Sequence, residues 1–415
     1  MSKNKLSVEP YKGVRDFYPE DYAALSYIRD TWRQVAYKAG YAEYEASILE
    51  PSDLYKAKGA ENEEMVSQQT YTFLDRGERE VTLRPEMTPT VARMVAGKRR
   101  ELGFPLRYFS IPNCFRYERP QRGRLREFWQ LNVDIFGSRS MVADAEILGV
   151  AYGMMMAFGA TESDFVIKVG SRAYINGVIA ELGVSDEDAK KLFVLLDRRE
   201  KMPREDFLHA LSELSMPEST VLPEHPPAEI AEMLAKFKEA GINNIVWDPS
   251  IVRGFAYYTG LVFEVFDTHA DNNRAIAGGG RYDNLTALFD DEPLPGVGFA
   301  IGDATMRDFL EVRGLLPAYV PKTQLYIATP SPELAYDVQS LAGELRRAGL
   351  NVAIDFGERK LGDQIKAATK HKIPWLMVAG SDEFAKNEFT LRNLDTGHEE
   401  TMPLEQLAAF VLGQN

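Results

Sequence analysis

Residues 114–130 read CFRYERPQRGRLREFWQ, and this stretch holds the densest group of functional side chains in the sequence. It contains five arginines, and Glu118 is the only carboxylate between the first and the last of them. Pro120 and Gly123 indicate a loop, because both residue types interrupt regular structure. Guanidinium groups gathered on such a loop suit a polyphosphate or a nucleic-acid backbone. Taken alone, the stretch also fits an ordinary charged hairpin.

Strands are predicted on both sides of this loop and further along the chain. We expect them at residues 106–115, 127–136, 165–169, 261–266 and 296–302. A hairpin with Arg76-Gly77 at its turn is expected within residues 69–91, and it leads into a helix. Long apolar strands joined by tight turns favour one large antiparallel sheet with helices packed on it.

Helical segments accompany these strands. Residues 21–39 space apolar side chains at helical intervals. Residues 147–160 form an apolar run shorter than the roughly 20 residues that a membrane span needs, so we expect a buried helix there. Residues 186–241 are rich in charge and helical in period, with a proline-rich break. They indicate a helical insertion, at about 175–242, within a domain that covers residues 1–320.

The pattern changes again after Pro317 and Pro321, where short apolar strands alternate with helices. This alternation predicts a compact α/β unit over residues 321–415, with a mixed sheet as the default. The fold expected for the whole chain is therefore an α+β domain with a large antiparallel sheet and a helical insertion, followed by a C-terminal α/β domain.

The composition argues against several classes of protein. The 415 residues carry 48 Lys and Arg against 62 Asp and Glu, and the formal net charge of −14 argues against sequence-blind binding to polyanions. Cys114 is the only cysteine, so an intrachain disulfide is impossible, and the five scattered histidines do not form a zinc pattern. The N-terminus lacks the apolar segment of a signal peptide. We therefore expect a cytoplasmic protein that does not span a membrane.

Residues 115–137 resemble motif 2 of the class II aminoacyl-tRNA synthetases in its histidyl form. Three further blocks follow that family's pattern: LRPEMT at 83–88, RGFAYYTG at 253–260 and GGGRYDNL at 278–285. Pro51 stands where motif 1 places its proline. Each block alone could be a structural turn, but together and in this order they identify the chain as a member of the histidyl class IIa group. The C-terminal unit is similar to the anticodon-binding domain of that group.

The resemblance implies a fold and a reaction. The fold is the class II synthetase type, with an anticodon-binding domain at residues 321–415. The implied reaction joins L-histidine to ATP as histidyl-adenylate and then transfers it to the 3′ end of the histidine tRNA. Mg²⁺ would arrive with ATP, because the triphosphate charge needs neutralising. The family also implies a homodimer formed through motif 1.

Site residues carry over where this sequence matches the family's motifs. Histidine presents an imidazole, an ammonium and a carboxylate, so both anionic and neutral hydrogen-bonding groups are needed to recognise it. The residues implied to bind histidine are Glu86, Met87, Thr88, Arg116, Gln130, Asp134, Arg253, Tyr257 and Tyr258.

Two arginines are implied to be catalytic. Arg116 would hold the α-phosphate and the amino-acid carboxylate, and Arg253 would oppose the charge that develops during in-line attack on the α-phosphorus. ATP would be bound by Arg116, Glu118 and Phe128. Phe128 would stack on adenine, with a core strand aromatic as the alternative.

Arg281 and Tyr282 line the pocket in one interpretation and are structural in another. Lys366 and Lys370 share one face of a predicted helix over 361–372 and could contact tRNA, although a solvated helix face explains them equally well. Anticodon contact is implied by the domain resemblance and not by these lysines.

Two positions depart from the family's pattern. Ala256 stands where the family usually has aspartate. Thr305 stands where motif 3 should place the arginine that holds the γ-phosphate. Arg307 is no substitute, because two residues along a helix turn the side chain by about 200°. The usual γ-phosphate clamp is therefore either absent or supplied from elsewhere in the chain, with the following candidates: Arg122, Arg124 and Arg126.

A rival interpretation is a non-catalytic synthetase-like protein that senses histidine, as in the regulatory subunit of ATP phosphoribosyltransferase. Such proteins generally lose the C-terminal domain and degrade the block found here at 253–260. This chain keeps both. The missing motif 3 arginine is the feature that favours the rival.

Overall fold

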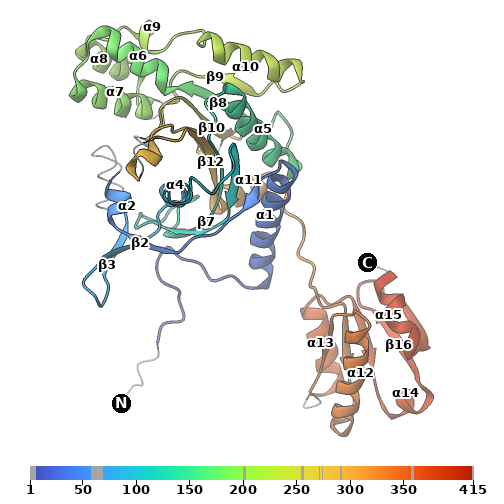
Figure 1. Ribbon diagram of the computed structural model, residues 1–415. Helices are drawn as coiled ribbons and strands as arrows, with labels where there is room; N and C mark the ends of the chain where they lie inside the picture. Colours follow the sequence, from blue (N-terminus) through green and yellow to red (C-terminus); the bar gives the residue numbers. More distant parts are fainter. Residues whose placement is uncertain are drawn as a thin grey trace. The chain divides into compact units, whose positions relative to one another are not determined.

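The computed structural model describes residues 6–57, 69–199, 202–253, 257–270, 272, 274–289, 292–356 and 359–413. The chain forms two compact units, Met1–Pro317 and Ala318–Asn415, shown in Figure 1. Ala256, one of the two departures noted above, lies outside the described residues. None of the described helices has the length and apolar character needed to cross a membrane.

The first unit is built on a large sheet. Within the described residues it has nine strands in the order β1-β5-β7-β12-β11-β10-β8-β9, with β6 paired to β7. The strands are β1 (Ala42–Glu43), β5 (Leu106–Ser110), β6 (Asn113–Phe115), β7 (Glu127–Phe136), β8 (Phe165–Ser171), β9 (Ile245–Trp247), β10 (Leu261–Asp267), β11 (Ala275–Arg281) and β12 (Gly296–Gly302). The interior pairs are antiparallel, as predicted. The edge pairs β1–β5 and β8–β9 are parallel, so the sheet is mixed.

The sheet has one apolar and one polar face, because successive side chains of a strand point to opposite sides. In β7, Leu131 and Val133 belong to the main hydrophobic core. Gln130, Asn132 and Asp134 alternate with them and line a pocket on the other face. The same alternation continues in β10 and β12. Antiparallel sheets commonly show this division, and here it sets the site on the face opposite the core.

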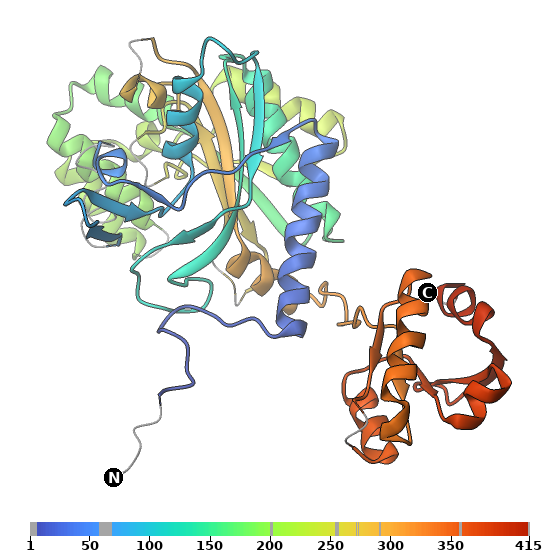
Figure 2. The same cartoon turned by 60° about the horizontal axis from the view of Figure 1, so that its bottom comes forward.

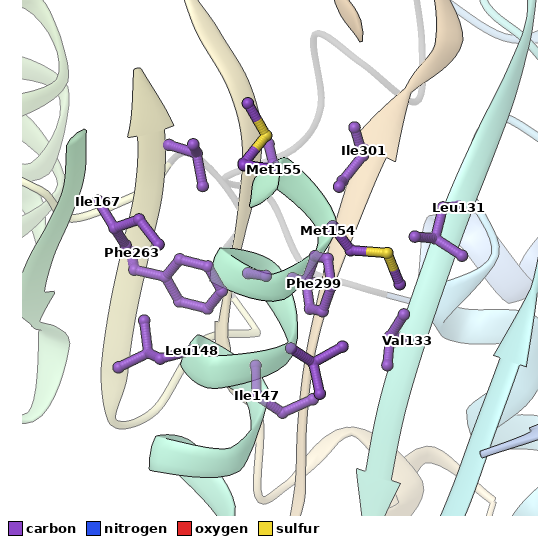
Figure 3. Close-up of a cluster of buried hydrophobic side chains, with 14 of the residues drawn as sticks. Leu131, Val133, Ile147, Leu148, Met154, Met155, Ile167, Phe263, Phe299 and Ile301 are labelled. Atoms are coloured by element: carbon purple, nitrogen blue, oxygen red, sulfur yellow. The ribbon is translucent and has the colours of Figure 1, made fainter. Parts of the chain in front are cut away.

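Four helices cover the apolar face (Figures 1 and 2): α1 (Pro19–Lys38), α5 (Met141–Ala157), α10 (Ala228–Glu239) and α11 (Asp303–Val312). Figure 3 shows Ile147, Leu148, Met154 and Met155 of α5 among side chains of β7, β10 and β12. The helix begins after Ser140, whose side chain accepts a hydrogen bond from the Val142 amide. The apolar run at 147–160 is therefore a buried helix, as expected.

A second sheet has three strands in the order β2-β4-β3 and contains the expected hairpin. Its elements are β2 (Leu49–Pro51), α2 (Asp53–Lys56), β3 (Tyr71–Leu74), β4 (Glu80–Leu83) and α4 (Thr88–Gly97). The turn lies between β3 and β4, as predicted, with Glu78 in the left-handed region at φ 60°.

Helices fill the segment between β8 and β9. They are α6 (Arg172–Leu182), α7 (Asp186–Arg198), α8 (Arg204–Glu213), α9 (Glu218–Val221) and α10. A separate hydrophobic cluster joins α6, α7 and α8, and it includes Val252, which directly precedes the RGFAYYTG block. The core of the insertion therefore reaches the strand connection that carries Arg253.

The second unit has a five-stranded sheet in the order β14-β13-β15-β16-β17 within its described residues. Its elements are β13 (Leu325–Ala328), η4 (Pro332–Leu334), α12 (Ala335–Arg347), β14 (Val352–Ile354), α13 (Leu361–Lys370), β15 (Trp375–Val378), α14 (Ser381–Lys386), β16 (Glu388–Asn393), β17 (Glu399–Pro403) and α15 (Leu404–Gly413). The pairs β13–β14 and β13–β15 are parallel and the others antiparallel, which confirms the expected mixed sheet.

Candidate active site

A small pocket of about 100 Å³ lies on the polar face of the large sheet. All the residues expected to bind histidine line it except Met87: Glu86, Thr88, Arg116, Gln130, Asp134, Arg253, Tyr257 and Tyr258. The Tyr257 hydroxyl donates to Glu86 Oε2 at 3.2 Å. The pocket thus combines carboxylates with neutral donors and acceptors, a set that suits a small ligand with N–H groups.

Asp134 is one of the two buried carboxylates that line this pocket. The Tyr282 hydroxyl donates a short hydrogen bond to its Oδ1, while Oδ2 is buried without a hydrogen-bond partner in the described part of the chain. Burial raises the pKa of Asp134 to about 7, and the bond from Tyr282 offsets only part of that rise. Burial also raises the pKa of Tyr282, so its hydroxyl stays protonated and donates. Oδ2 is therefore an acceptor available to a bound N–H group.

The raised pKa of Asp134 predicts a pH-dependent loss of stability. The folded protein holds this proton more tightly than the unfolded chain, so the contribution is complete below about pH 4 and is lost as the pH rises through about 7. Asp134→Asn stays neutral and should avoid that loss. Between pH 5 and pH 8, urea unfolding should show the variant gaining on the order of 1–3 kcal/mol relative to the unmodified protein. A difference that does not change with pH would contradict the assignment.

A larger cavity of about 640 Å³ adjoins the small pocket. The two share Arg116, Gln130, Arg253, Gly278 and Ala300 as lining residues. Glu118 and Phe128, which are expected to bind ATP, line the large cavity only. The arrangement is therefore a small polar pocket that opens into a larger one, with arginines at the junction.

Arg116 stands at this junction with its charge available. Its Nε donates to the Pro85 carbonyl at 2.9 Å, and its guanidinium carbon lies 5.2 Å from the centre of the Phe128 ring. Among the described residues no carboxylate forms an ion pair with it. A flat apolar ring beside an unpaired guanidinium can accept a base on one side and a phosphate on the other.

Arg253 is held at the junction from two sides. Its Nη1 donates to Glu264 of β10. Its backbone has φ 59°, a left-handed conformation that is rare for residues other than glycine and typical of constrained functional positions. The buried side chain of Arg172 donates to the Arg253 carbonyl at 3.1 Å and lies over the Phe193 ring of α7. The insertion therefore helps to fix the backbone of Arg253.

Glycines make room for these side chains. A Cβ atom on Gly278 of β11 would collide with the Arg253 guanidinium, and one on Gly298 of β12 would collide with Asp134 Oδ1. The first four residues of the block at 278–285 therefore belong to a strand in which the absence of side chains shapes the cavity. The block is not only a turn before a helix.

Comparison with known proteins shows the family of the chain. A family model described as histidyl-tRNA synthetase matches residues 13–304, and a model described as an anticodon binding domain matches residues 324–414. The chain belongs to the histidyl-tRNA synthetase family. It is 38% identical to a histidine–tRNA ligase of Leptospira biflexa, with 98% of each chain covered. It is 35% identical to one of Thermoplasma volcanium, covering 98% of this chain and 99% of the relative.

The fold of this histidyl-tRNA synthetase family member matches that of solved relatives. The crystal structure of histidyl-tRNA synthetase from Nostoc sp. aligns with a TM-score of 0.80 at 24% identity, covering 99% of this chain and 100% of that one. That of apo histidyl-tRNA synthetase from S. aureus aligns with a TM-score of 0.77 at 24% identity, covering 98% and 100%. At this identity the likeness supports the fold, and the α+β class with a C-terminal anticodon-binding domain is confirmed.

Two residues singled out in the family's blocks lie away from the pocket. Met87 is fully buried at the start of α4, with its Sδ 4.0 Å from Arg84 Nη1, and lines neither cavity. Arg281 pairs with the buried Asp144 of α5 and donates to the Ser138 carbonyl at 2.8 Å. The structural interpretation therefore holds for Arg281, whereas Tyr282 lines the pocket.

Thr305, which stands at the expected motif 3 position, lies at the start of α11. Thr305 lines the large cavity, and its Oγ1 lies 3.1 Å from the Ile276 carbonyl oxygen and 3.0 Å from the Gly302 carbonyl oxygen. Arg307 instead pairs with Asp21 and Glu311 outside the cavity. The expectation that Arg307 cannot replace the missing arginine is confirmed.

Several residues that line the two cavities were not anticipated from the sequence, among them Asn132, Glu264 and Arg274. Asn132 lines the small pocket between Gln130 and Asp134, and the period-two alternation along β7 could have revealed it. Glu264 and Arg274 line the large cavity. Neither residue belongs to a recognised motif. Glu264 contacts Arg253, and Arg274 directly precedes β11.

The lysines considered for tRNA contact are exposed in the second unit. Lys366 lies 3.3 Å from Asp363 on α13, and 82% of its side chain is accessible. Arg359 pairs with Asp355 and donates to the Tyr326 hydroxyl at 3.0 Å. The solvated helix face therefore remains a sufficient explanation of the lysines.

Proposed function

We propose that this protein is a histidine–tRNA ligase. The observation that carries the proposal is the junction of two cavities at Arg116 and Arg253. The small pocket is furnished for an amino acid with N–H groups, and the larger one has the size and charge for a nucleotide. The reacting carboxylate and α-phosphate would meet between them.

In the first step an oxygen of the histidine carboxylate attacks the α-phosphorus of ATP. The bond between that phosphorus and the bridging oxygen to the β-phosphate breaks, and pyrophosphate leaves with the electron pair. Charge builds on the oxygens of the α-phosphate, and fixed guanidinium groups stabilise it without reorganising. Arg253 and Arg116 are the groups that would do so here.

In the second step a hydroxyl at the 3′ end of the tRNA attacks the acyl carbon of histidyl-adenylate, and AMP leaves. The same pocket holds the histidine side chain through both steps. Asp134 and Glu86 would accept hydrogen bonds from the imidazole and the ammonium of histidine, and Tyr257, Tyr258, Thr88 and Gln130 would complete the set.

ATP would occupy the larger cavity, with Phe128 and Arg116 beside the base and the α-phosphate. Mg²⁺ would enter with the nucleotide to neutralise the triphosphate. The described residues contain no cluster of three carboxylate, histidine or cysteine side chains suited to a resident metal ion. Glu118 is the carboxylate that lines the loop end of the cavity, and it would be the protein donor to an ATP-borne Mg²⁺.

The remaining assignments follow from family membership. We propose that the unit Met1–Pro317 is catalytic and that the unit Ala318–Asn415 binds the anticodon of the histidine tRNA. We also propose a cytoplasmic homodimer. The small sheet supports an interface, because Leu49, Phe73 and Leu74 expose 45%, 47% and 66% of their surface.

Histidine-dependent exchange of pyrophosphate into ATP tests the proposal. The purified protein should catalyse this exchange with histidine and not with other amino acids, because a hydrogen-bonding pocket rejects ligands that leave its polar groups unpaired. Transfer of radioactive histidine to histidine tRNA should then follow. Histidine binding without any exchange would reject the ligase and favour a histidine sensor, the rival that the loss of the motif 3 arginine suggested.

A further inference from the structure

The loss of the motif 3 arginine leaves one end of the nucleotide cavity to be explained. Thr305 carries no charge, and its hydroxyl is directed at the backbone carbonyls of Ile276 and Gly302. Its Cγ2 would lie 3.3 Å from a Cβ on Gly123, so the tip of the arginine-rich loop meets the start of α11 here. A triphosphate whose α-phosphate lies at Arg116 needs a cation at this end.

The three arginines considered for this role from the sequence all interact with other groups of the protein, and only one of them lines the cavity. Arg122 pairs with Asp308 at 2.7 Å and does not line the cavity. Arg126 donates to the Glu118 carbonyl, and its guanidinium lies 4.1 Å from the centre of the Tyr117 ring. Arg124 lines the cavity but lies 3.4 Å from the carboxylate of Glu118.

Arg274 lies at the same end of the cavity. It directly precedes β11, two residues before the Ile276 carbonyl that contacts Thr305. Its Nη1 donates to the Arg122 carbonyl at 2.6 Å, which joins the start of β11 to the tip of the loop. A guanidinium group has five donors, so others remain for a ligand.

The charges of the cavity single out the same residue. Four arginines and two glutamates line it. Arg253 pairs with Glu264 and Arg124 pairs with Glu118. Arg116 and Arg274 are the lining arginines to which no carboxylate of the described ranges is paired. The positive charge without an ion-pair partner among the described residues therefore lies at two places. One is Arg116, at the junction of the cavities, and the other is Arg274, at the end of the large cavity beside the arginine-rich loop.

We propose that Arg274 holds the γ-phosphate of ATP in place of the arginine that Thr305 replaces. This assignment rests on the proposed function, since it takes ATP as the occupant of the cavity. Arg274 stabilises the pyrophosphate as it leaves, because the electron pair of the broken bond to the α-phosphorus adds a further negative charge to the β- and γ-phosphates. The guanidinium group that contacts the γ-phosphate is then supplied by the residue before β11 and not by α11.

Equilibrium binding of ATP, ADP and AMP, measured by calorimetry without histidine, tests this assignment. Arg274→Ala should weaken ATP binding by about tenfold to a hundredfold, the range for charge-assisted hydrogen bonds. ADP and AMP binding should change by less than about twofold, since neither has a γ-phosphate. Arg274→Gln is a second variant of similar shape. Arg307→Ala is the matched control, because that arginine belongs to α11 but faces away from the cavity, and its ATP affinity should be unchanged.

Unchanged ATP affinity in folded Arg274→Ala would overturn the assignment, and so would an equal loss for ATP and ADP. Failure of the proposed function looks different, since unmodified protein would then show no histidine-dependent exchange. The calorimetric titrations measure ATP binding without turnover, so they test the role of Arg274 independently of whether the protein catalyses the exchange. In the exchange reaction, Arg274→Ala should raise the KM for ATP while leaving the KM for histidine near its original value.

Discussion

Replacement of Arg253 by alanine is expected to lower the rate of histidine-dependent ATP–pyrophosphate exchange by about 10²–10³-fold, the loss seen when one preorganised charge-stabilising donor is removed. Arg253 stands where the two cavities meet, and it is held by Glu264 and by the contact of Arg172 with its carbonyl. Because its backbone and its guanidinium are both fixed, it stabilises developing charge at no cost of reorientation.

The effect should fall on kcat more than on the KM for histidine. Arg253→Lys keeps a charge but loses the fork that reaches two oxygens, and it should show an intermediate loss. Thermal unfolding of both variants should stay cooperative, because Arg253 lies at the cavity wall and outside the main core. An exchange rate within about twofold of the unmodified protein would remove Arg253 from its catalytic role.

Gly298→Ala should weaken histidine binding and destabilise the protein. The added methyl group would lie against Asp134 Oδ1, 2.5 Å from the Val133 carbonyl oxygen and 2.8 Å from the Tyr282 hydroxyl. The backbone of β7 cannot yield easily, so we expect a cost of about 1–3 kcal/mol from overpacking. Displacing the Asp134 carboxylate removes a charge-assisted hydrogen bond, which should weaken histidine binding by about 10–100-fold.

Gly177→Ala is the matched control for this variant. Gly177 lies inside α6, and a Cβ there meets no atom within 4 Å. The same chemical change should therefore stabilise the protein by about 0.5–1 kcal/mol, since alanine favours a helix over glycine. Calorimetric titration with histidine and thermal unfolding of both variants test the contrast. Equal histidine affinity in Gly298→Ala and Gly177→Ala would refute the close packing around Asp134.

The sequence predicted the bounds of the long, apolar strands well. The bounds of β7 and β12 agree with the predicted ranges 127–136 and 296–302. β11 was not predicted as a strand, because its AIAGGGR sequence has low strand propensity. Its glycines are explained by the side chains that approach it from Arg253 and Phe299, and such contacts are visible only in three dimensions.

The site was predictable where residues belong to recognisable blocks. Glu86, Asp134 and Arg253 come from separate blocks and meet in one pocket. Arg274 could not be found this way, since its significance depends on its position near the uncharged Thr305 at the same end of the cavity. Met87 shows the opposite case, because a residue can belong to a ligand block while its side chain is buried in the interior.

The position of β12 within the sheet has a consequence for synthesis of the chain. It is the last strand of the large sheet to emerge from the ribosome, yet it lies in the middle, between β7 and β11. Until it arrives, those two strands lack their shared neighbour, and neither cavity has its floor. A ligand of either cavity can bind only the completed domain, so it stabilises the folded state and cannot assist the stages that come before β12 is in place.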